Sequence, residues 1–249
     1  MVMRRAPAWI RNRSLEKPRF RGAFASLDEA IAAIPPETCV GYDNDETVAK
    51  NFELMCRVAP ADGPVLTLLQ RLLPEAPLIL DAGGHMGTKY RAFSEPLALG
   101  ERAIDWIVWD TPAAVRAGRR QAEKDGLTRL SFVNDLAEAP AADILLCSGL
   151  LQYLDIPFSA LVAKLAGKPR HLILNKVATR DGPTVVMLEA IGPSEVAYQV
   201  RDRRALEREI DALGYDVVEQ WELPDLSHVI AGNPGLGSST SRGYYAKLR

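Results

Sequence analysis

From Leu78 onward, short apolar runs alternate with amphipathic helical segments, which strongly limits the folds open to the chain. Strands are predicted at residues 78–81, 105–110, 130–135, 143–149, 171–177, 215–223 and 244–248. Helices are predicted between several of them, at residues 111–126, 158–167 and 201–214. Short apolar strands separated by such helices are typical of a mostly parallel sheet covered on both faces. We therefore expect a seven-stranded, doubly wound α/β domain.

The first 75 residues show helical patterns and no strand-like run. Ser26 and Glu29 have the spacing of a capping box, and Pro35 and Pro36 end the short helix that follows. Further helices are predicted over about 43–59 and 65–74. In the N-terminal tail, between Arg4 and Arg21, Lys and Arg outnumber the acidic residues. We interpret this tail as a solvated segment rather than as a nucleic-acid contact. Residues 1–75 are thus predicted to be a basic tail and a helical extension packed on the core.

Two segments add to the alternating pattern. Residues 183–200 contain two alternating stretches around Ile191-Gly192-Pro193-Ser194, which predicts a β-hairpin inserted at the sheet edge. Residues 228–243 form a Gly/Ser-rich loop before the last predicted strand. Both segments are candidates for a lid over a pocket, and both are equally consistent with passive excursions.

Composition excludes several classes of protein. A length of 249 residues with 47% hydrophobic content suits one α/β domain, and a net charge of -2 gives no overall attraction to nucleic acid or anionic membrane. Cys39, Cys56 and Cys147 form no CxxC pair, so we predict no metal site and a reducing, cytoplasmic environment. No apolar stretch approaches the roughly 18 residues that span a bilayer, so no stable membrane insertion is expected. The oligomeric state is left open.

The glycine turn after the first predicted strand, in the stretch PLILDAGGHMG, is the expected ligand site, because ligands bind beyond the carboxyl ends of parallel strands. Read as a dinucleotide motif, it is Ala82-x-Gly84-x-x-Gly87, with alanine at the first glycine. Read as the S-adenosylmethionine motif D-x-G-x-G-x-G, it has His85 at the middle glycine. Each reading has one mismatch, so the glycines alone do not separate the two cofactors.

Acidic residues at the strand ends add information. A carboxylate at Asp81 suits a ligand with a positive amino-acid end and would repel a pyrophosphate, although it could also cap the next helix. Asp110 could accept the ribose hydroxyls of either cofactor, or cap the helix after Pro112. Asn134 and Asp135 could meet the adenine amino group, or serve as turn residues.

These segments, together with DILLCSGLLQYL at 143–154, resemble the class I S-adenosylmethionine-dependent methyltransferases. More narrowly, the chain resembles a bacterial methyltransferase family often associated with surface-polysaccharide gene clusters. The shared features are Gly41-Tyr42-Asp43, the DxGG turn, Trp106 to Pro112 and Ser148 to Leu154. The resemblance covers residues from about 40 to the end and implies a Rossmann-like methyltransferase domain over residues 76–249. It is specific for fold and cofactor class, and weak for substrate.

The resemblance also implies roles for individual residues. Tyr42 and the helix after it would fold across S-adenosylmethionine. Asp110 would hold the ribose, and Asn134 or Asp135 the adenine edge. The remaining implied contacts are with the methionine side and the sulfonium, at Asp81, Gly83, Gly84, Gly87, Ser148 and Gly149. His85 departs from the family pattern, because a Cβ constrains the backbone where the family has glycine.

Transfer to a hydroxyl requires a base. His228, in the loop where a lid would close, is our preferred candidate, and His85 could also reach the methyl site. Tyr153 is the third candidate catalytic residue, which could line the methyl site or equally be a packed aromatic. Asn175 and Lys176 end a strand at the ligand edge, where a lysine could hold an acidic acceptor. The chain has no N-P-P-Y or D-P-P-Y motif for transfer to nitrogen and no basic stripe over the pocket for nucleic acid. Elimination therefore favours a hydroxyl of a small molecule, sugar or glycan.

Three hypotheses follow from the sequence. The first is an S-adenosylmethionine-dependent methyltransferase that acts on oxygen. The second is an NAD(P)-dependent oxidoreductase that uses the Ala82-x-Gly84-x-x-Gly87 motif. The third is a catalytically inactive, methyltransferase-like binding protein, which His85 favours.

Overall fold

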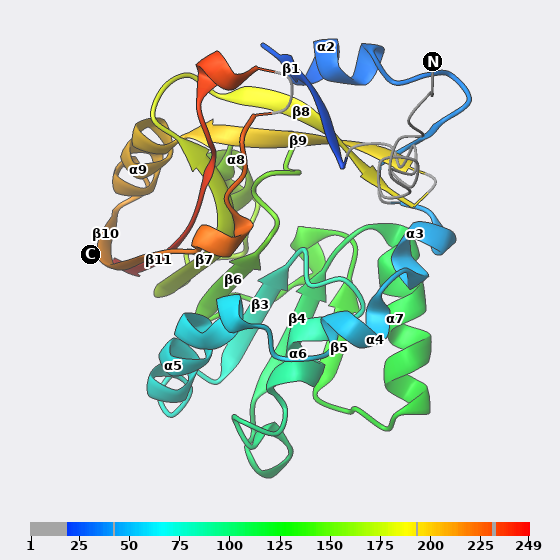
Figure 1. Ribbon diagram of the computed structural model, residues 1–249. Helices are drawn as coiled ribbons and strands as arrows, with labels where there is room; N and C mark the ends of the chain where they lie inside the picture. The colour runs from blue at the N-terminus through cyan, green and yellow to red at the C-terminus, as the bar shows by residue number, and fades with distance from the viewer. Residues whose placement is uncertain (1–18, 42, 193, 231–232) are drawn as a thin grey trace, which may run out of the picture.

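The computed structural model of the chain describes residues 19–41, 43–192, 194–230 and 233–249. Its central feature is a parallel sheet in the order β5-β4-β3-β6-β7. These strands are β3 (Leu78–Ala82), β4 (Asp105–Trp109), β5 (Leu130–Val133), β6 (Ile144–Ser148) and β7 (His171–Arg180). At the β7 edge, β11 (Thr240–Leu248) pairs antiparallel with β7, and β10 (Tyr215–Glu222) pairs antiparallel with β11. The predicted seven strands are therefore all present (Figure 1).

Helices cover both faces of this sheet because its strands are apolar on both sides. One face packs against α5 (Gly63–Leu72), α6 (Thr88–Phe93) and α7 (Pro112–Lys124), in a core that surrounds Trp106. The other face packs against α8 (Phe158–Ala163) and α9 (Arg203–Ala212). The doubly wound arrangement is confirmed.

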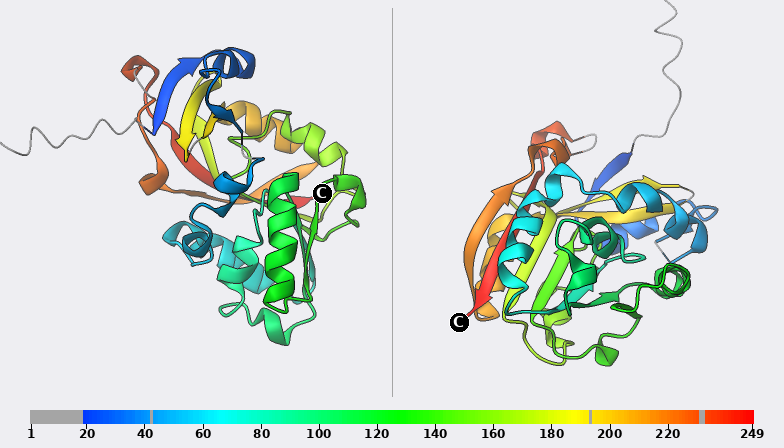
Figure 2. Two further views of the ribbon diagram at one scale, coloured as in Figure 1. Left: turned by 90° about the vertical axis from the view of Figure 1, so that its right-hand side faces the viewer. Right: turned by 90° about the horizontal axis from the view of Figure 1, so that it is seen from below.

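The expectation of seven strands is too low, because the sheet has 11 described strands. The predicted hairpin is present as β8 (Val185–Ile191) and β9 (Ser194–Asp202), which pair antiparallel. The end of β7 pairs parallel with β9 and so joins the hairpin to the main sheet. Figures 1 and 2 show β8 and β9 lying across the end of the sheet toward which the parallel strands run. The hairpin therefore lies above the expected ligand edge.

The prediction that no strand precedes residue 75 is wrong. β1 (Phe20–Phe24) pairs antiparallel with β8, and β2 (Cys39–Val40) pairs parallel with β9. The predicted first helix is present as α2 (Leu27–Ala32), where the Glu29 backbone N–H donates to Ser26 Oγ at 3.2 Å. The next predicted helix is divided into α3 (Asp45–Ala49) and α4 (Phe52–Met55) at Asn51, which has a left-handed φ of 61°.

Within the described residues, no helix has the length and apolar character needed to cross a bilayer. The basic tail up to residue 18 lies outside the described residues, as does Tyr42.

Candidate functional site

The turn at residues 83–87 joins β3 to α6 and uses most of its own backbone donors. The Gly83 N–H donates to the Trp109 carbonyl at 2.8 Å, and the N–H groups of Gly87 and Thr88 donate to the Gly84 carbonyl at 3.0 and 3.3 Å. The His85 N–H donates to Asp110 Oδ2 at 2.7 Å. Three of the five amides in this turn, those of Gly83, His85 and Gly87, therefore already have acceptors within the protein.

Two glycines of the turn are required by packing inside the protein. A Cβ at Gly84 would lie 2.5 Å from Asp81 Oδ2, and a Cβ at Gly87, where φ is +74°, would lie 2.6 Å from a Leu130 methyl group. Both distances are shorter than a carbon contact allows, so a side chain at either position would displace its neighbour. The glycine pattern thus reflects the close approach of the turn to β3 and β5.

Asp81 lies beneath the turn, and this corrects the expectation that its carboxylate meets the ligand. Its side chain is 1% exposed, and the buried Trp106 indole N–H donates to Asp81 Oδ2 at 3.1 Å. Burial raises the pKa of Asp81 to about 7, against the opposing effect of the Trp106 hydrogen bond. The Asp81 side chain points into the core, where the Trp106 indole of the neighbouring strand β4 supplies a hydrogen-bond donor. Asp81 supports Gly84 rather than contacting the ligand edge.

Asp110 follows β4 and lies at the ligand edge, as predicted. Its Oδ2 accepts from the His85 N–H, and its Oδ1 accepts from the Thr111 N–H at 2.7 Å. Burial raises the pKa of this carboxyl, while the two backbone donors oppose the rise. Each carboxylate oxygen has two lone pairs, so both retain capacity for a further donor such as a ribose hydroxyl.

His85 adopts a left-handed backbone conformation with a φ of 58°. Its Nδ1 is buried without a hydrogen-bond partner. Burial lowers the pKa of the imidazole, although the Asp110 carboxylate and a hydrogen bond to the Val48 backbone oppose this effect. The neutral ring thus lies beside the ribose-side acid Asp110 and residue Val48 of α3.

Replacing His85 with glycine is expected to stabilise the fold by about 0.5–1 kcal/mol. A left-handed non-glycine residue costs roughly 1–2 kcal/mol, from which the greater backbone entropy of glycine in the unfolded chain must be subtracted. Urea denaturation measures the change. Gly87→Ala is the matched opposite, because its added methyl group meets Leu130, and it should destabilise the fold. If His85→Gly is less stable than wild type, the packing of the imidazole ring stabilises the fold by more than the left-handed backbone of His85 destabilises it.

The N-terminal segment closes over the turn. Asp43 Oδ1 accepts from the Ala113 N–H in the first turn of α7 at 2.8 Å. Ser194 Oγ, at the start of β9, contacts Thr47 Oγ1 at 3.0 Å and accepts from Asn44 Nδ2 at 3.1 Å. The segment after Tyr42 is therefore fastened both to the ribose-side helix and to the hairpin.

The other predicted cofactor residues have different environments. Asn134 and Asp135 are exposed, and Asp135 Oδ1 caps a short 3-10 helix by accepting from the Ala137 N–H at 3.0 Å. Ser148 and Gly149 end β6, where Asn175 Nδ2 contacts Ser148 Oγ at 3.4 Å and the Gly149 N–H donates to the Asn175 carbonyl at 2.9 Å. The turn chemistry of Asp135 is thus present, and the adenine contact stays a prediction.

Tyr153 and His228 meet in one aromatic cluster beneath the hairpin. Tyr198 of β9 makes edge contacts with both rings, with centroids 5.4 Å from Tyr153 and 5.8 Å from His228. His228 also stacks on Phe20 of β1 at 4.4 Å. Burial lowers the pKa of His228, so its ring is neutral at pH 7 and able to accept a proton.

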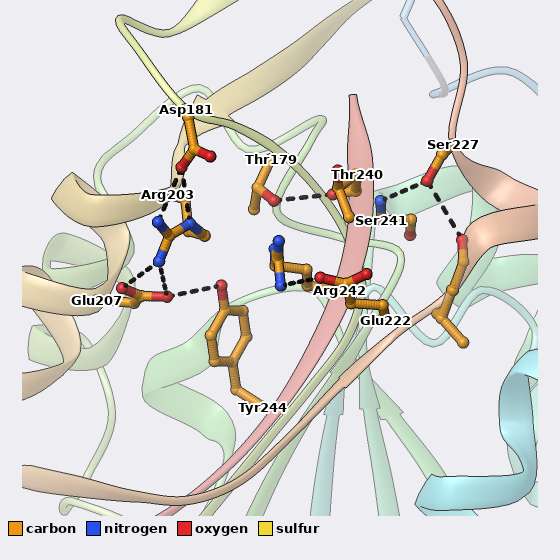
Figure 3. Close-up of polar contacts among 11 residues, drawn as sticks. Thr179, Asp181, Arg203, Glu207, Glu222, Ser227, Thr240, Ser241, Arg242 and Tyr244 are labelled. Atoms are coloured by element: carbon orange, nitrogen blue, oxygen red, sulfur yellow. Dashed lines mark hydrogen bonds and ion pairs between the residues drawn. The ribbon is translucent and has the colours of Figure 1, made fainter. Parts of the chain in front are cut away.

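The loop that carries His228 is tied to β11. Figure 3 shows Ser227 Oγ accepting from the Ser241 N–H, at 3.2 Å, and the Thr179 hydroxyl donating to the Thr240 carbonyl, at 2.8 Å. Ser239 Oγ lies 3.2 Å from His228 Nδ1. These contacts fix the position of the imidazole beside the cluster.

Sequence reasoning missed Glu189 and Asp62. Glu189 of β8 is buried, accepts from the Tyr153 hydroxyl at 2.6 Å and pairs with Arg19 at 2.7 Å. Asp62 is also buried and pairs with Lys89 at 2.7 Å and Lys176 at 2.8 Å. Asp62 lies between two predicted helices and Glu189 lies within the predicted hairpin. Neither context marks a carboxylate as buried, so neither residue had a sequence signal.

Among the described residues, no group of three or more His, Cys, Asp or Glu side chains could hold a metal ion.

No family model matches the chain, and no curated protein matches its sequence. Solved structures do match its fold. The N-terminal domain of EvdMO1 with S-adenosylhomocysteine bound aligns at a TM-score of 0.51 and 19% identity, over 77% of this chain and 83% of that one. Magnesium protoporphyrin IX methyltransferase from Synechocystis PCC 6803, also with S-adenosylhomocysteine bound, aligns at 0.50 and 16% identity, over 82% and 96%. The chain therefore shares the Rossmann-like α/β fold of these two structures.

Proposed function

We propose that the protein is an S-adenosylmethionine-dependent methyltransferase. The observation that carries this proposal is that backbone N–H groups of the glycine turn already donate to protein acceptors. A pyrophosphate binds to free backbone N–H groups at such a turn. Here the N–H groups of Gly83, His85, Gly87 and Thr88 all donate to protein acceptors, and the acceptor for His85 is the Asp110 carboxylate. At the centre of the turn, a diphosphate would have to displace the bond from the His85 N–H and approach the Asp110 carboxylate, whereas an adenosyl ligand without phosphate would not.

The same observation weighs against the NAD(P)-dependent oxidoreductase. Because Asp81 is buried, its charge no longer distinguishes S-adenosylmethionine from NAD(P). The preference for S-adenosylmethionine now depends on the bond between the His85 amide and Asp110. The residues at the ligand edge fit an adenosyl ligand, because Asp110 offers acceptors for two adjacent ribose hydroxyls. Ser148 and Gly149 would lie beneath the sulfonium.

When bound, S-adenosylmethionine supplies a methyl group activated by its sulfonium. The residues of this chain must then align an acceptor oxygen and remove its proton. His228 is the proposed proton acceptor. Tyr153 shares its aromatic cluster, donates to the buried Glu189 and would line the methyl site. The acceptor is proposed to be a hydroxyl of a small molecule, sugar or glycan, and the location to be the cytoplasm. His85 is less suited to this task, since it lies at the ribose side.

A thermal-shift series tests the cofactor. S-adenosylhomocysteine should raise the melting temperature, since a ligand at about 100 times its Kd adds about 2.7 kcal/mol to the stability of the folded state. NAD and NADP at the same concentration should leave it unchanged. Stabilisation by NAD or NADP alone would favour the oxidoreductase, and no shift with any of the three at millimolar concentration would favour the non-catalytic binding protein.

Asp110→Ala is expected to weaken S-adenosylhomocysteine binding by about 1–3 kcal/mol, because it leaves ribose hydroxyls and the His85 amide unpaired. Isothermal titration calorimetry measures the change. Asp135→Ala serves as a comparison at the predicted adenine edge, where the side chain is exposed and the expected loss is smaller. Equal affinity of Asp110→Ala and wild type would remove Asp110 from the site.

A further inference from the structure

Two partly buried lysines and one buried aspartate form a cluster beside the glycine turn. Asp62 lies at the end of η1 (Pro60–Asp62), Lys89 in α6 and Lys176 in β7. Lys89 Nζ is 2.7 Å from Asp62 Oδ2, and Lys176 Nζ is 2.8 Å from Asp62 Oδ1. The side chain of Asp62 is 0% exposed, compared with 12% for Lys89 and 22% for Lys176.

The charges of this cluster do not balance. Two partly buried ammonium groups contact a single carboxylate, which leaves one positive charge unmatched within the cluster. Buried charges are normally paired, because an uncompensated one loses its hydration. Lys176 is the more exposed of the two lysines, so a small anion would reach it more readily than it would reach Lys89. The cluster thus has the charge and the access of an anion site.

The position of Lys176 is held firmly. The preceding residue, Asn175, donates to the Ala61 carbonyl at 3.0 Å and accepts from the Trp221 indole N–H at 3.0 Å. Lys176 itself has a left-handed φ of 58° in the middle of a strand. Such a conformation is unfavourable for a residue with a side chain and persists where the surroundings impose it, often at functional sites. In this backbone conformation, the Lys176 ammonium lies beside Asp62.

We propose that the Lys89–Asp62–Lys176 cluster is an anion subsite that binds a carboxylate. The inference rests on the proposed function for its place beside an adenosyl ligand. Asp110 lies at the end of β4, while Lys176 extends from β7, two strands beyond the glycine turn of β3. A ligand across the strand ends would therefore meet an acidic residue at one end and net positive charge at the other. The carboxylate belongs either to the amino-acid end of the cofactor or to the methyl acceptor.

The first experiment compares S-adenosylhomocysteine with 5′-methylthioadenosine, which lacks the amino-acid end, by calorimetry. If the cluster binds the cofactor carboxylate, Lys176→Met should weaken S-adenosylhomocysteine about tenfold or more and change 5′-methylthioadenosine less than about twofold. Lys176→Arg should keep most of the affinity. Lys164→Met is the matched control, because it removes an exposed lysine of the same charge. Melting temperatures without ligand verify that each variant folds.

The second experiment follows backbone amide signals by NMR as acetate or its neutral counterpart acetamide is added to the S-adenosylhomocysteine complex. If the carboxylate comes from the acceptor, acetate should shift the amides around Lys89 and Lys176, acetamide should not, and Lys176→Met should abolish the response. Equal ligand affinities across the variants together with no acetate response would overturn the proposal. If neither adenosyl ligand binds, the proposed function fails, and the acetate titration of the free protein decides the anion subsite separately.

Discussion

Asp62→Asn is expected to destabilise the fold by about 3–5 kcal/mol, the usual consequence of removing one partner from a buried ion pair. Burial alone would raise the pKa of Asp62, but the ammonium groups of Lys89 and Lys176 outweigh it and hold that pKa below its ordinary value. The carboxylate is therefore charged in the folded protein at neutral pH. An amide in its place leaves two partly buried ammonium groups near each other without a counter-charge.

Chemical denaturation at pH 7 measures this change. Asp105→Asn is the matched control, because Asp105 pairs with Arg129 at 2.9 Å where both side chains are about half exposed, and exposed pairs contribute roughly 0–1 kcal/mol. Equal losses in the two variants would contradict the buried-charge account of the cluster. A smaller loss when Asp62→Asn is combined with Lys89→Met would locate the cost in the unpaired ammonium groups, as a double-mutant cycle measures.

The main architecture could be predicted because it depends on local patterns. Apolar strands alternating with amphipathic helices leave few arrangements other than a doubly wound sheet. The hairpin at β8 and β9 was recognisable for the same reason, since its two alternating stretches flank a Gly-Pro turn. In contrast, β1 contains Gly22 and two nearby arginines, and it is a strand because β8 offers it a pairing edge. Such context decides strand formation more than local preference does.

The candidate site was less predictable, because its polar contacts join distant parts of the chain. The sequence places Asp110 correctly, since the end of a parallel strand fixes where a following residue lies. It does not reveal which way a side chain turns at that end. Asp81 turned inward because Trp106 supplies a donor from the neighbouring strand. Lys89 and Lys176 lie on different elements, and only the path of the segment before α5 brings Asp62 between them.

Asp81→Asn is expected to make the protein more stable than wild type at alkaline pH, by up to about 4 kcal/mol. The pKa of Asp81 is about 7 in the folded protein, raised by burial. An aspartate in an unfolded chain has a pKa of about 3.9, and each unit of difference is worth about 1.4 kcal/mol. Below about pH 4 both states hold the proton. Between about pH 4 and 7 only the folded state holds it, so the stability that Asp81 contributes falls as the pH rises and levels off above 7.

The amide of asparagine carries no charge at any of these pH values and keeps an oxygen that can accept the Trp106 N–H. The difference in unfolding free energy between Asp81→Asn and wild type should therefore be near zero at pH 4 and grow until about pH 7 to 8. Urea denaturation across this range isolates the effect, because other titrating groups are common to both proteins. Asp225→Asn, at an exposed position, should differ from wild type by less than about 0.5 kcal/mol at each pH. A difference for Asp81→Asn that stays constant from pH 4 to 8 would mean that Asp81 titrates normally and is open to water. Its carboxylate would then be available to a ligand, as the sequence first suggested.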